Sequence, residues 1–216
     1  MAGNGNGVSR KAKPLLMFPC NGNAIEALDC LGQDYQLVGF VDDLPAKQDT
    51  RVHGYPVFSR VAFKEKADAF VLAVPGSPTS YQSRRTIIDG LELSANRFAQ
   101  VIHPTARVSP LAVIGQNVLI MAGVVVTSNA VIGDNVCILP NSVVHHDVVV
   151  GAFSLIGSNV TISGHAVVGE NCYIGSGSSV MNSLSVGRGA LIGLGSNVIR
   201  DVPANARVVG NPGRQI

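Results

Sequence analysis

The second half of the chain carries a hydrophobic residue at every sixth position. From residue 108 to residue 198 these positions hold only valine or isoleucine: Val108, Ile114, Ile120, Val126, Ile132, Ile138, Val144, Val150, Ile156, Ile162, Val168, Ile174, Val180, Val186, Ile192 and Val198. A strand repeats every two residues and a helix every 3.6, so neither explains the pattern. A period of six predicts short parallel strands wound into a triangular prism, with a β-branched side chain pointing inward from each face. We therefore expect a parallel β-helix.

Small residues mark the predicted corners of this prism. Glycine recurs once per coil, at positions 115, 133, 151, 169 and 187, and the fourth residue after each inward position is usually small. Since stacked strands lie about 4.8 Å apart, roughly five coils form a column about 24 Å tall. Nothing interrupts the register, so no loop is expected to leave the column. The pattern does not determine the handedness of the β-helix, although parallel crossovers are normally right-handed.

The first half alternates between strands and helices. Strands are predicted at 15–18, 35–43, 68–74 and 97–102, and helices at 24–31 and 80–93. Strand–helix–strand order favours a parallel sheet of the Rossmann-like, nucleotide-binding type. Two prolines, Pro104 and Pro110, bracket the connection to the first coil. The predicted organisation is a disordered leader at 1–13, an α/β domain at 14–104 and a β-helix at 105–216.

A turn after the first predicted strand is a candidate nucleotide site. It reads PCNGN and contains Asn21, Gly22 and Asn23, while the second strand ends in Asp42 and Asp43. Backbone amides at such a turn can approach a phosphate, and an acid at the end of the second strand can bind ribose hydroxyls. The full GxGxxG motif is absent, and the GNGNG at 3–7 follows no strand. A plain turn without a ligand is the alternative interpretation.

The stretch SVVHHDVVVG, residues 142–151, holds the candidate catalytic residues. Val144 and Val148 occupy inward positions, so His145, His146 and Asp147 lie at an outward corner. The core does not need them, which makes them a candidate acid–base site. A solvated polar corner is the alternative.

Composition and charge exclude several functions. The formal net charge is +2, which gives no reason to expect nucleic acid as a partner. No apolar run approaches the roughly 20 residues of a membrane helix, and none after the basic leader is long enough for a signal peptide. The four cysteines form no CxxC pair, which favours reduced thiols over a disulfide frame or a zinc site. We expect a cytoplasmic protein without a metal cofactor.

Both halves together resemble bacterial nucleotide-sugar N-acetyltransferases that act on 4-amino sugars, within the sialic-acid acetyltransferase-like superfamily. The resemblance rests on GFVDD at 39–43, the HD pair at 146–147, the hexapeptide repeat and the ending DVPANARVVGNPGRQI. It implies a left-handed β-helix and a homotrimer with active sites between subunits. It also implies acetyl transfer from acetyl-CoA to the 4-amino group of a nucleotide-linked amino-deoxy sugar, in O-antigen (lipopolysaccharide) or glycoprotein biosynthesis.

The resemblance also implies roles for individual residues. His146 is the expected general base and Asp147 its partner, in a direct transfer without a protein nucleophile. The residues implied to bind the nucleotide sugar are Asn21, Gly22, Asn23, Asp42, Asp43 and His145. Those implied to line the coenzyme groove are Leu155, Gly164, Gly175 and Gly193. Two departures are visible: PCNGN replaces the common GxSGH, and Leu155 stands where relatives often carry a histidine.

Other functions remain open on the sequence alone. The chain could O-acetylate a sugar such as sialic acid, or serve as a non-catalytic trimeric scaffold. An NAD(P)-dependent redox enzyme is disfavoured by the missing glycines. Apolar residues at outward positions, such as Leu119, Val125, Val149 and Leu191, suggest a surface that a trimer would cover.

Overall fold

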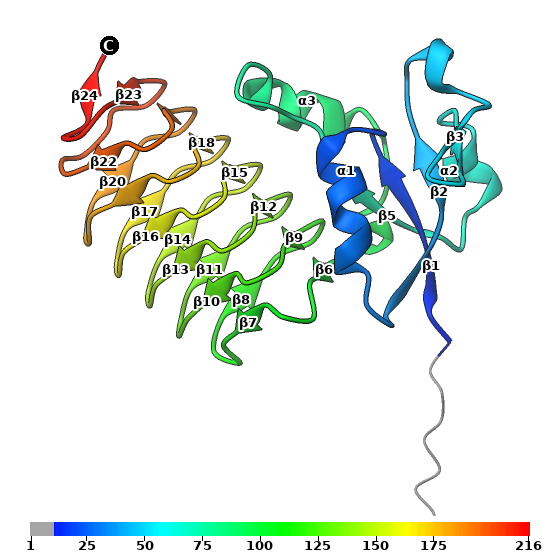
Figure 1. Ribbon diagram of the computed structural model, residues 1–216, viewed down its shortest axis with the longest axis horizontal. Coiled ribbons are helices and arrows are strands. Elements are labelled where there is room, and N and C mark those ends of the chain that lie inside the picture. Colours follow the sequence, from blue (N-terminus) through cyan, green and yellow to red (C-terminus); the bar gives the residue numbers. More distant parts are fainter. Residues whose placement is uncertain (1–10) are drawn as a thin grey trace, which may run out of the picture.

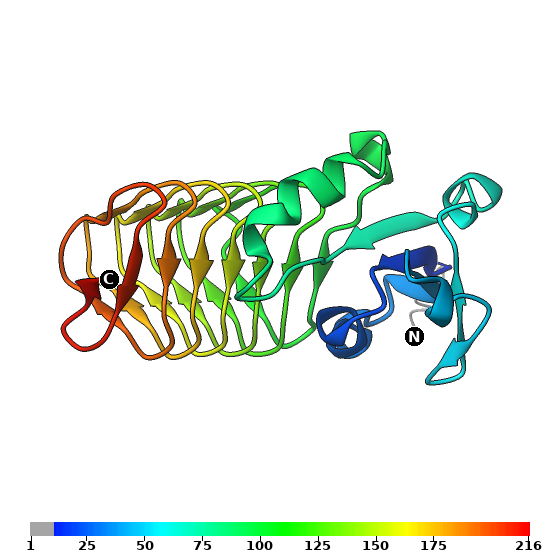
Figure 2. The ribbon, with the colours of Figure 1, turned by 90° about the horizontal axis from the view of Figure 1, so that it is seen from above.

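The computed structural model describes residues 11–216 as an α/β domain followed by a left-handed parallel β-helix (Figure 1). The coils stack into a column with three sheets as its faces, and Figure 2 shows this column from the side. Face A contains β7 (Arg107–Val108), β10 (Val125–Val126), β13 (Val143–Val144), β16 (Thr161–Ile162), β19 (Ser179–Val180) and β22 (Asn197–Val198). Face B contains β8 (Val113–Ile114), β11 (Val131–Ile132), β14 (Val149–Val150), β17 (Val167–Val168) and β20 (Ser185–Val186).

Face C is the longest and contains β6 (Val101–Ile102), β9 (Leu119–Ile120), β12 (Cys137–Ile138), β15 (Leu155–Ile156), β18 (Tyr173–Ile174), β21 (Leu191–Ile192), β23 (Arg207–Val209) and β24 (Arg214–Gln215). Strands 18 residues apart pair in parallel, as β13 with β16 and β14 with β17. The predicted valine and isoleucine series fills the interior, with Val108 and Ile114 of the first coil partly exposed. The predicted β-helix is confirmed.

Buried serines satisfy the backbone at two corners of the column. Ser142 donates from Oγ to the carbonyl of Gly157 (2.7 Å) and accepts from the amide of Val160 (3.0 Å). Ser178 repeats this arrangement at the same corner, between faces C and A, and Ser154 repeats it at the corner between faces B and C. Because an unpaired polar group in an apolar core is costly, these bonds explain why small hydroxyl residues recur there.

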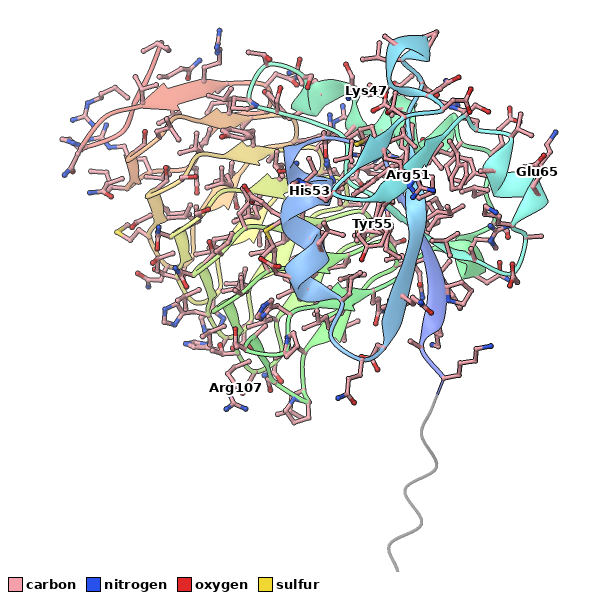
Figure 3. All side chains as sticks on the ribbon, turned by 45° about the vertical axis from the view of Figure 1, so that its right-hand side comes forward. Lys47, Arg51, His53, Tyr55, Glu65 and Arg107 are labelled. Carbon is pink, nitrogen blue, oxygen red and sulfur yellow. The ribbon has the colours of Figure 1, made fainter. Side chains whose placement is uncertain are left out.

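The α/β domain is built on a five-stranded sheet in the order β3–β4–β2–β1–β5. Its strands are β1 (Lys13–Phe18), β2 (Tyr35–Val41), β3 (Arg51–Val52), β4 (Tyr55–Phe58) and β5 (Phe70–Ala73). Its helices are α1 (Gly22–Glu26), η1 (Ala27–Cys30), η2 (Pro45–Lys47), α2 (Ala62–Glu65), η3 (Tyr81–Ser83), α3 (Arg84–Asp89) and η4 (Ala95–Arg97). All pairs are parallel except the β3–β4 hairpin, whose side chains are seen in Figure 3.

The structure differs from the sequence-based prediction at several places. The β3–β4 hairpin was not predicted. The last strand expected in the α/β domain, 97–102, contributes only Val101–Ile102, which pairs with β9 and so belongs to the β-helix. The leader was expected to reach residue 13, but Lys13 begins β1. Residues 1–10, including the GNGNG stretch, lie outside the described residues.

The α/β domain packs on face C of the column. Leu119, Cys137, Leu155 and Tyr173 share one apolar cluster with residues of α1 and η1 such as Ala24. Leu119 is fully buried there and Leu191 packs against the same cluster. The expectation that these two leucines form an outer surface is wrong, because the chain's own α/β domain covers them.

A buried arginine fastens the two domains at a second point. Arg84 is 1% exposed and donates from Nε to the carbonyl of Phe153 (2.9 Å). Its other nitrogens donate to the carbonyls of Pro75 and Asn135. Burial lowers the pKa of the Arg84 guanidinium. Since these acceptors belong to the end of β5 and to two coils, the side chain fixes the sheet relative to the column.

No helix in residues 11–216 has both the length and the apolar character required to span a bilayer.

Candidate active site

His146 and Asp147 lie at the corner between faces A and B, here called the A/B corner. His146 Nδ1 is 2.8 Å from Asp147 Oδ2, and Asp147 Oδ1 accepts a hydrogen bond from Asn129 Nδ2 (3.0 Å). The hydrogen bonds from His146 and then from Asn129 lower the pKa of Asp147. An ionised carboxylate only accepts, so in the neutral imidazole of His146 the proton is on Nδ1 and the lone pair is on Nε2. This arrangement suits a general base.

A glycine of the next coil lies directly beneath the His146 ring. A Cβ atom built on Gly164 would be only 2.7 Å from both Cε1 and Nε2 of His146. Gly164 has no left-handed backbone, so the close approach of the ring, and not its φ angle, requires glycine here.

A second histidine belongs to the corner. His165 occupies the same position as Asp147 one coil further on, and its Nδ1 lies 3.9 Å from Asp147 Oδ2. The rings of His146 and His165 meet edge to face, with centroids 5.0 Å apart. The sequence reading missed both His165 and Asn129. The usable signal was the coil length, since residues 18 positions before and after Asp147 stack on it.

His145 is half-buried at the start of the same corner. Its backbone amide donates to Ile162, and its side chain makes no hydrogen bond within the described part of the chain. Its expected contact with substrate stays a prediction.

The predicted nucleotide turn follows β1, and the side chains of its own asparagines hold its backbone by hydrogen bonds. Asn21 caps α1 by accepting from the amide of Ala24 (3.0 Å) and donates to the carbonyl of Val74 (3.1 Å). Asn23 Nδ2 lies 3.5 Å from the carbonyls of Val74 and Gly76. Gly22 is exposed. The turn is thereby joined to the end of β5.

The two acids after β2 have different environments. Asp42 is buried and accepts from the amides of Cys20 (3.0 Å) and Leu44 (2.9 Å). Lys47, labelled in Figure 3, donates to Asp42 Oδ2 (2.9 Å) and also to the carbonyl of Cys20 (2.6 Å). Asp43 is exposed and forms a bidentate pair with Arg60 (2.6 and 2.7 Å). Asp42 therefore braces the turn, while Asp43 faces solvent.

The residues expected to line the coenzyme groove are not neighbours in one chain. Leu155 is 3% exposed and lies in the cluster beneath the α/β domain. Gly175 and Gly193 lie at the corner between faces C and A, whereas Gly164 lies at the A/B corner. A Cβ on Gly175 would meet the backbone of the next coil at 2.7 Å, and one on Gly193 would meet Val209 at 2.8 Å, so coil stacking accounts for these glycines.

The geometry of the column separates the two halves of the predicted site. The α/β domain covers face C, and the A/B corner lies opposite that face in the triangular cross-section. His146 and the turn at Asn21 thus lie on different sides of the same prism.

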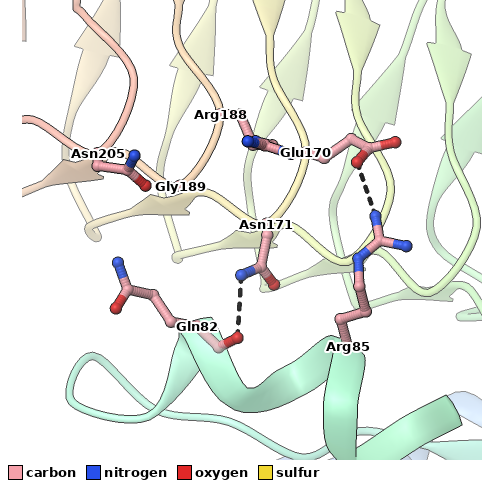
Figure 4. Close-up of a pocket in the computed structure, with 7 residues that line it drawn as sticks. All are labelled: Gln82, Arg85, Glu170, Asn171, Arg188, Gly189 and Asn205. Atoms are coloured by element: carbon pink, nitrogen blue, oxygen red, sulfur yellow. Dashed lines mark hydrogen bonds and ion pairs between the residues drawn. The ribbon is translucent and has the colours of Figure 1, made fainter.

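A polar cavity of about 660 Å³ lies where η3 and α3 meet the corner between faces B and C (Figure 4). Its residues are Gln82, Arg85, Glu170, Asn171, Arg188, Gly189 and Asn205. Arg85 pairs with Glu170 (2.6 Å), and Asn171 donates to the carbonyl of Gln82 (3.0 Å). The cavity was not predicted, and it contains none of the A/B corner residues.

The cysteines offer no nucleophile. All four are free and buried, and burial raises the pKa of Cys30 and Cys137 to about 12 and that of Cys172 to about 11. Since the thiolate is the reactive form, none is suited to carry an acyl group.

Comparison with known proteins agrees with this architecture. The family model "Bacterial transferase hexapeptide (six repeats)" matches residues 111–145 and 129–164. No curated protein matches the chain.

Several solved structures superpose on nearly the whole chain. The acetyltransferase domain of PglB from Neisseria gonorrhoeae is 27% identical, with a TM-score of 0.81 over 94% of this chain and 100% of that one. PerB from Caulobacter crescentus, solved with CoA and GDP-perosamine, is 26% identical, with a TM-score of 0.81 over 96% and 98%. WeeI from Acinetobacter baumannii is 25% identical, with a TM-score of 0.82 over 95% and 100%. The resemblance seen in the sequence is confirmed: the chain carries the hexapeptide repeat, and it shares with solved structures such as the PglB acetyltransferase domain an arrangement in which a small α/β domain precedes a left-handed β-helix.

Proposed function

We propose that the chain transfers the acetyl group of acetyl-CoA to the 4-amino group of a nucleotide-linked amino-deoxy sugar, with His146 as general base. The observation that carries this proposal is the hydrogen bond from His146 Nδ1 to the ionised Asp147, which leaves Nε2 free to accept a proton. The similar PglB domain has been solved with acetyl-CoA and PerB with CoA and GDP-perosamine. Variants of the Caulobacter enzyme in which one histidine is replaced by asparagine or alanine were also solved with both ligands.

The reaction is a direct displacement. The lone pair of the sugar's 4-amino group attacks the thioester carbonyl, the C–N bond forms and the C–S bond breaks. The nitrogen's surplus proton passes to Nε2 of His146 and from there to the departing CoA thiolate. Asp147 stabilises the imidazolium between these two transfers, and Asn129 holds the carboxylate in place.

The nucleotide end of the acceptor is assigned to the turn at Asn21, Gly22 and Asn23. Asp43 lies at the same edge of the sheet as this turn, and its exposed carboxylate can accept hydrogen bonds from ribose hydroxyls. Buried Asp42 supports it indirectly, because its carboxylate orders the backbone of Cys20 and Leu44.

A homotrimer would bring the separated parts together. The outward side of face B carries a stripe of Val113, Val131, Val149 and Val167, which are 60%, 37%, 38% and 42% exposed and aligned in register. Such contiguous apolar area favours cover by another copy. A groove between two prisms is bounded by a corner of each, so Gly164 of one chain and Gly175 and Gly193 of the next can line one coenzyme groove. We place the reaction in the cytoplasm, where acetyl-CoA and sugar nucleotides are made.

The test is a product assay on the full chain. Acetyl-CoA is supplied with a panel of UDP-, GDP- and dTDP-linked 4-amino sugars, and mass spectrometry follows the gain of one acetyl group. The matched 4-hydroxy sugars are assayed in parallel, and hydroxylamine distinguishes a labile ester from a stable amide. We expect amide formation with a 4-amino sugar, lost in His146→Ala. Transfer to hydroxyl acceptors alone, or transfer that His146→Ala leaves intact, would contradict the proposal.

A further inference from the structure

The A/B corner brings together a set of metal-binding side chains. The ligand atoms of His146, Asp147 and His165 all lie within 4.8 Å of one another. Two imidazoles and a carboxylate form a donor set that Zn²⁺ and similar transition metals bind readily. We propose that this cluster binds a divalent transition-metal ion such as Zn²⁺, which acts as an inhibitor of the acetyl transfer. The inhibitory part rests on the proposed role of His146.

The distances need little adjustment for an ion to bind. Ligands of a tetrahedral zinc ion lie about 3.3 Å apart, given metal–ligand bonds of about 2.0–2.1 Å. Asp147 Oδ2 is 2.8 Å from His146 Nδ1 and 3.9 Å from His165 Nδ1, on either side of that value. Both imidazoles are more than half exposed, so their rings can turn. Asn129 holds the other carboxylate oxygen, so the hydrogen-bond partner of Oδ2 is Nδ1 of His146, which is itself a proposed ligand.

Metal binding at His146 Nδ1 would abolish its function as a base. In the present arrangement Nδ1 carries the proton and Nε2 has the lone pair. An ion bound to Nδ1 needs the lone pair at that nitrogen, so the proton of the neutral ring must move to Nε2. Nε2 then has no lone pair with which to accept the proton of the amine. The ion thus inhibits by changing the tautomer as well as by occupying the site.

The folded chain offers few competing ligands. All four cysteines are buried, so no thiol is presented to a metal in solution. Nδ1 of His103 is already bonded to Thr105, and residues 11–216 contain no other group of three His, Cys, Asp or Glu side chains placed to hold an ion. Binding measured on the folded protein therefore reports mainly on the A/B corner.

The variant His165→Asn tests the site with little risk to folding. His165 has a φ of 60°, and Asn129 holds the same corner position with the same φ of 60°, so asparagine fits this left-handed backbone. Its amide is a poor ligand for Zn²⁺. His145→Asn is the matched control, because it removes an adjacent histidine that is not in the cluster.

Binding is measured without substrates, by titration calorimetry with ZnCl₂ and by the visible absorption of Co²⁺. We expect one ion per chain for the wild type, an affinity lower by about 10–100-fold in His165→Asn and an unchanged affinity in His145→Asn. In the acetyl-transfer assay Zn²⁺ should inhibit the wild type, and adding EDTA should restore its activity. Inhibition of His165→Asn to the same extent should need at least about tenfold more Zn²⁺.

Equal affinity of the wild type and His165→Asn overturns the site, and binding without inhibition overturns the inhibitory role. The outcomes are separable from those of the proposed function. A chain that binds Zn²⁺ through His165 but transfers no acetyl group contradicts the proposed function alone, and active transfer without Zn²⁺ binding contradicts the metal site alone.

Discussion

Gly164→Ala changes the catalytic geometry by a distance that follows from the structure. The new Cβ would lie 2.7 Å from Cε1 and Nε2 of His146, whereas ordinary contact begins at 3.4 Å. The ring must therefore move by at least about 0.7 Å. A misplacement of about 1 Å can cost about 10²-fold in rate, so we expect kcat to fall by about 10–10²-fold. The fold should be unaffected, because the ring is exposed and can yield, and alanine also restricts the unfolded chain.

Gly151→Ala is the contrasting control. Its Cβ would meet the backbone of the next coil, 2.5 Å from the carbonyl carbon of Gly169, and stacked backbones cannot yield as a ring can. We expect a loss of about 1–3 kcal/mol in the free energy of unfolding, or about 2–12 °C in Tm for a chain of this size. Steady-state kinetics and thermal unfolding are measured on both variants. A normal kcat in Gly164→Ala, or a Tm that falls as far as in Gly151→Ala, would refute the reasoning.

Four further substitutions test the remaining assignments. His146→Ala should lower kcat by about 10²–10⁴-fold and leave Tm unchanged. If steady-state kinetics instead show near-normal turnover in His146→Ala and a collapse of turnover in His145→Ala, His145 is the base. Asp147→Asn, which suits the left-handed φ of 58°, should lower kcat less than His146→Ala, because the imidazole remains. Asp43→Ala should raise KM for the nucleotide sugar about tenfold and leave that for acetyl-CoA unchanged; equal changes in both would argue against a nucleotide contact. Val131→Asp should dissociate the proposed trimer in light scattering and abolish activity, and an active monomer would exclude a shared active site.

The β-helix could be predicted from the sequence because one rule covers every coil. Each inward position must be apolar and β-branched, and a shift of register would bury polar residues. The sequence pattern therefore also predicts which strands pair and in which register. The α/β domain follows no such repeat. The β3–β4 hairpin depends on a turn at His53 and Gly54, both with positive φ, and β3 is only two residues long. The two apolar residues of strand β6 would fit either domain in sequence, and only the pairing of β6 with β9 shows that it belongs to the column.

The candidate site was predictable where neighbours in sequence are neighbours in space. His146 and Asp147 are adjacent and needed no fold to be found together. Asn129 and His165 are each 18 residues from Asp147, which is the length of one coil. The repeat therefore also predicts that these side chains lie next to Asp147, because equivalent corner positions of successive coils stack on one another. The position of Leu155 could not be predicted, because outward residues of face C are buried only when the α/β domain is docked on them.

The docking of the α/β domain also bears on the proposal that the active site is shared between chains. Tyr81 donates to the carbonyl of Gly189 (2.9 Å), and Arg84 to those of Phe153 and Asn135, so the sheet is fixed against the column at several coils. A hinge that carried the turn at Asn21 around the prism to His146 would break these buried hydrogen bonds, each of which is costly to leave unmade. Under the proposed function, the acceptor held by one chain's turn would therefore have to meet the base of another chain. The exposed valines of face B, which flank the A/B corner, would supply the apolar area for that association.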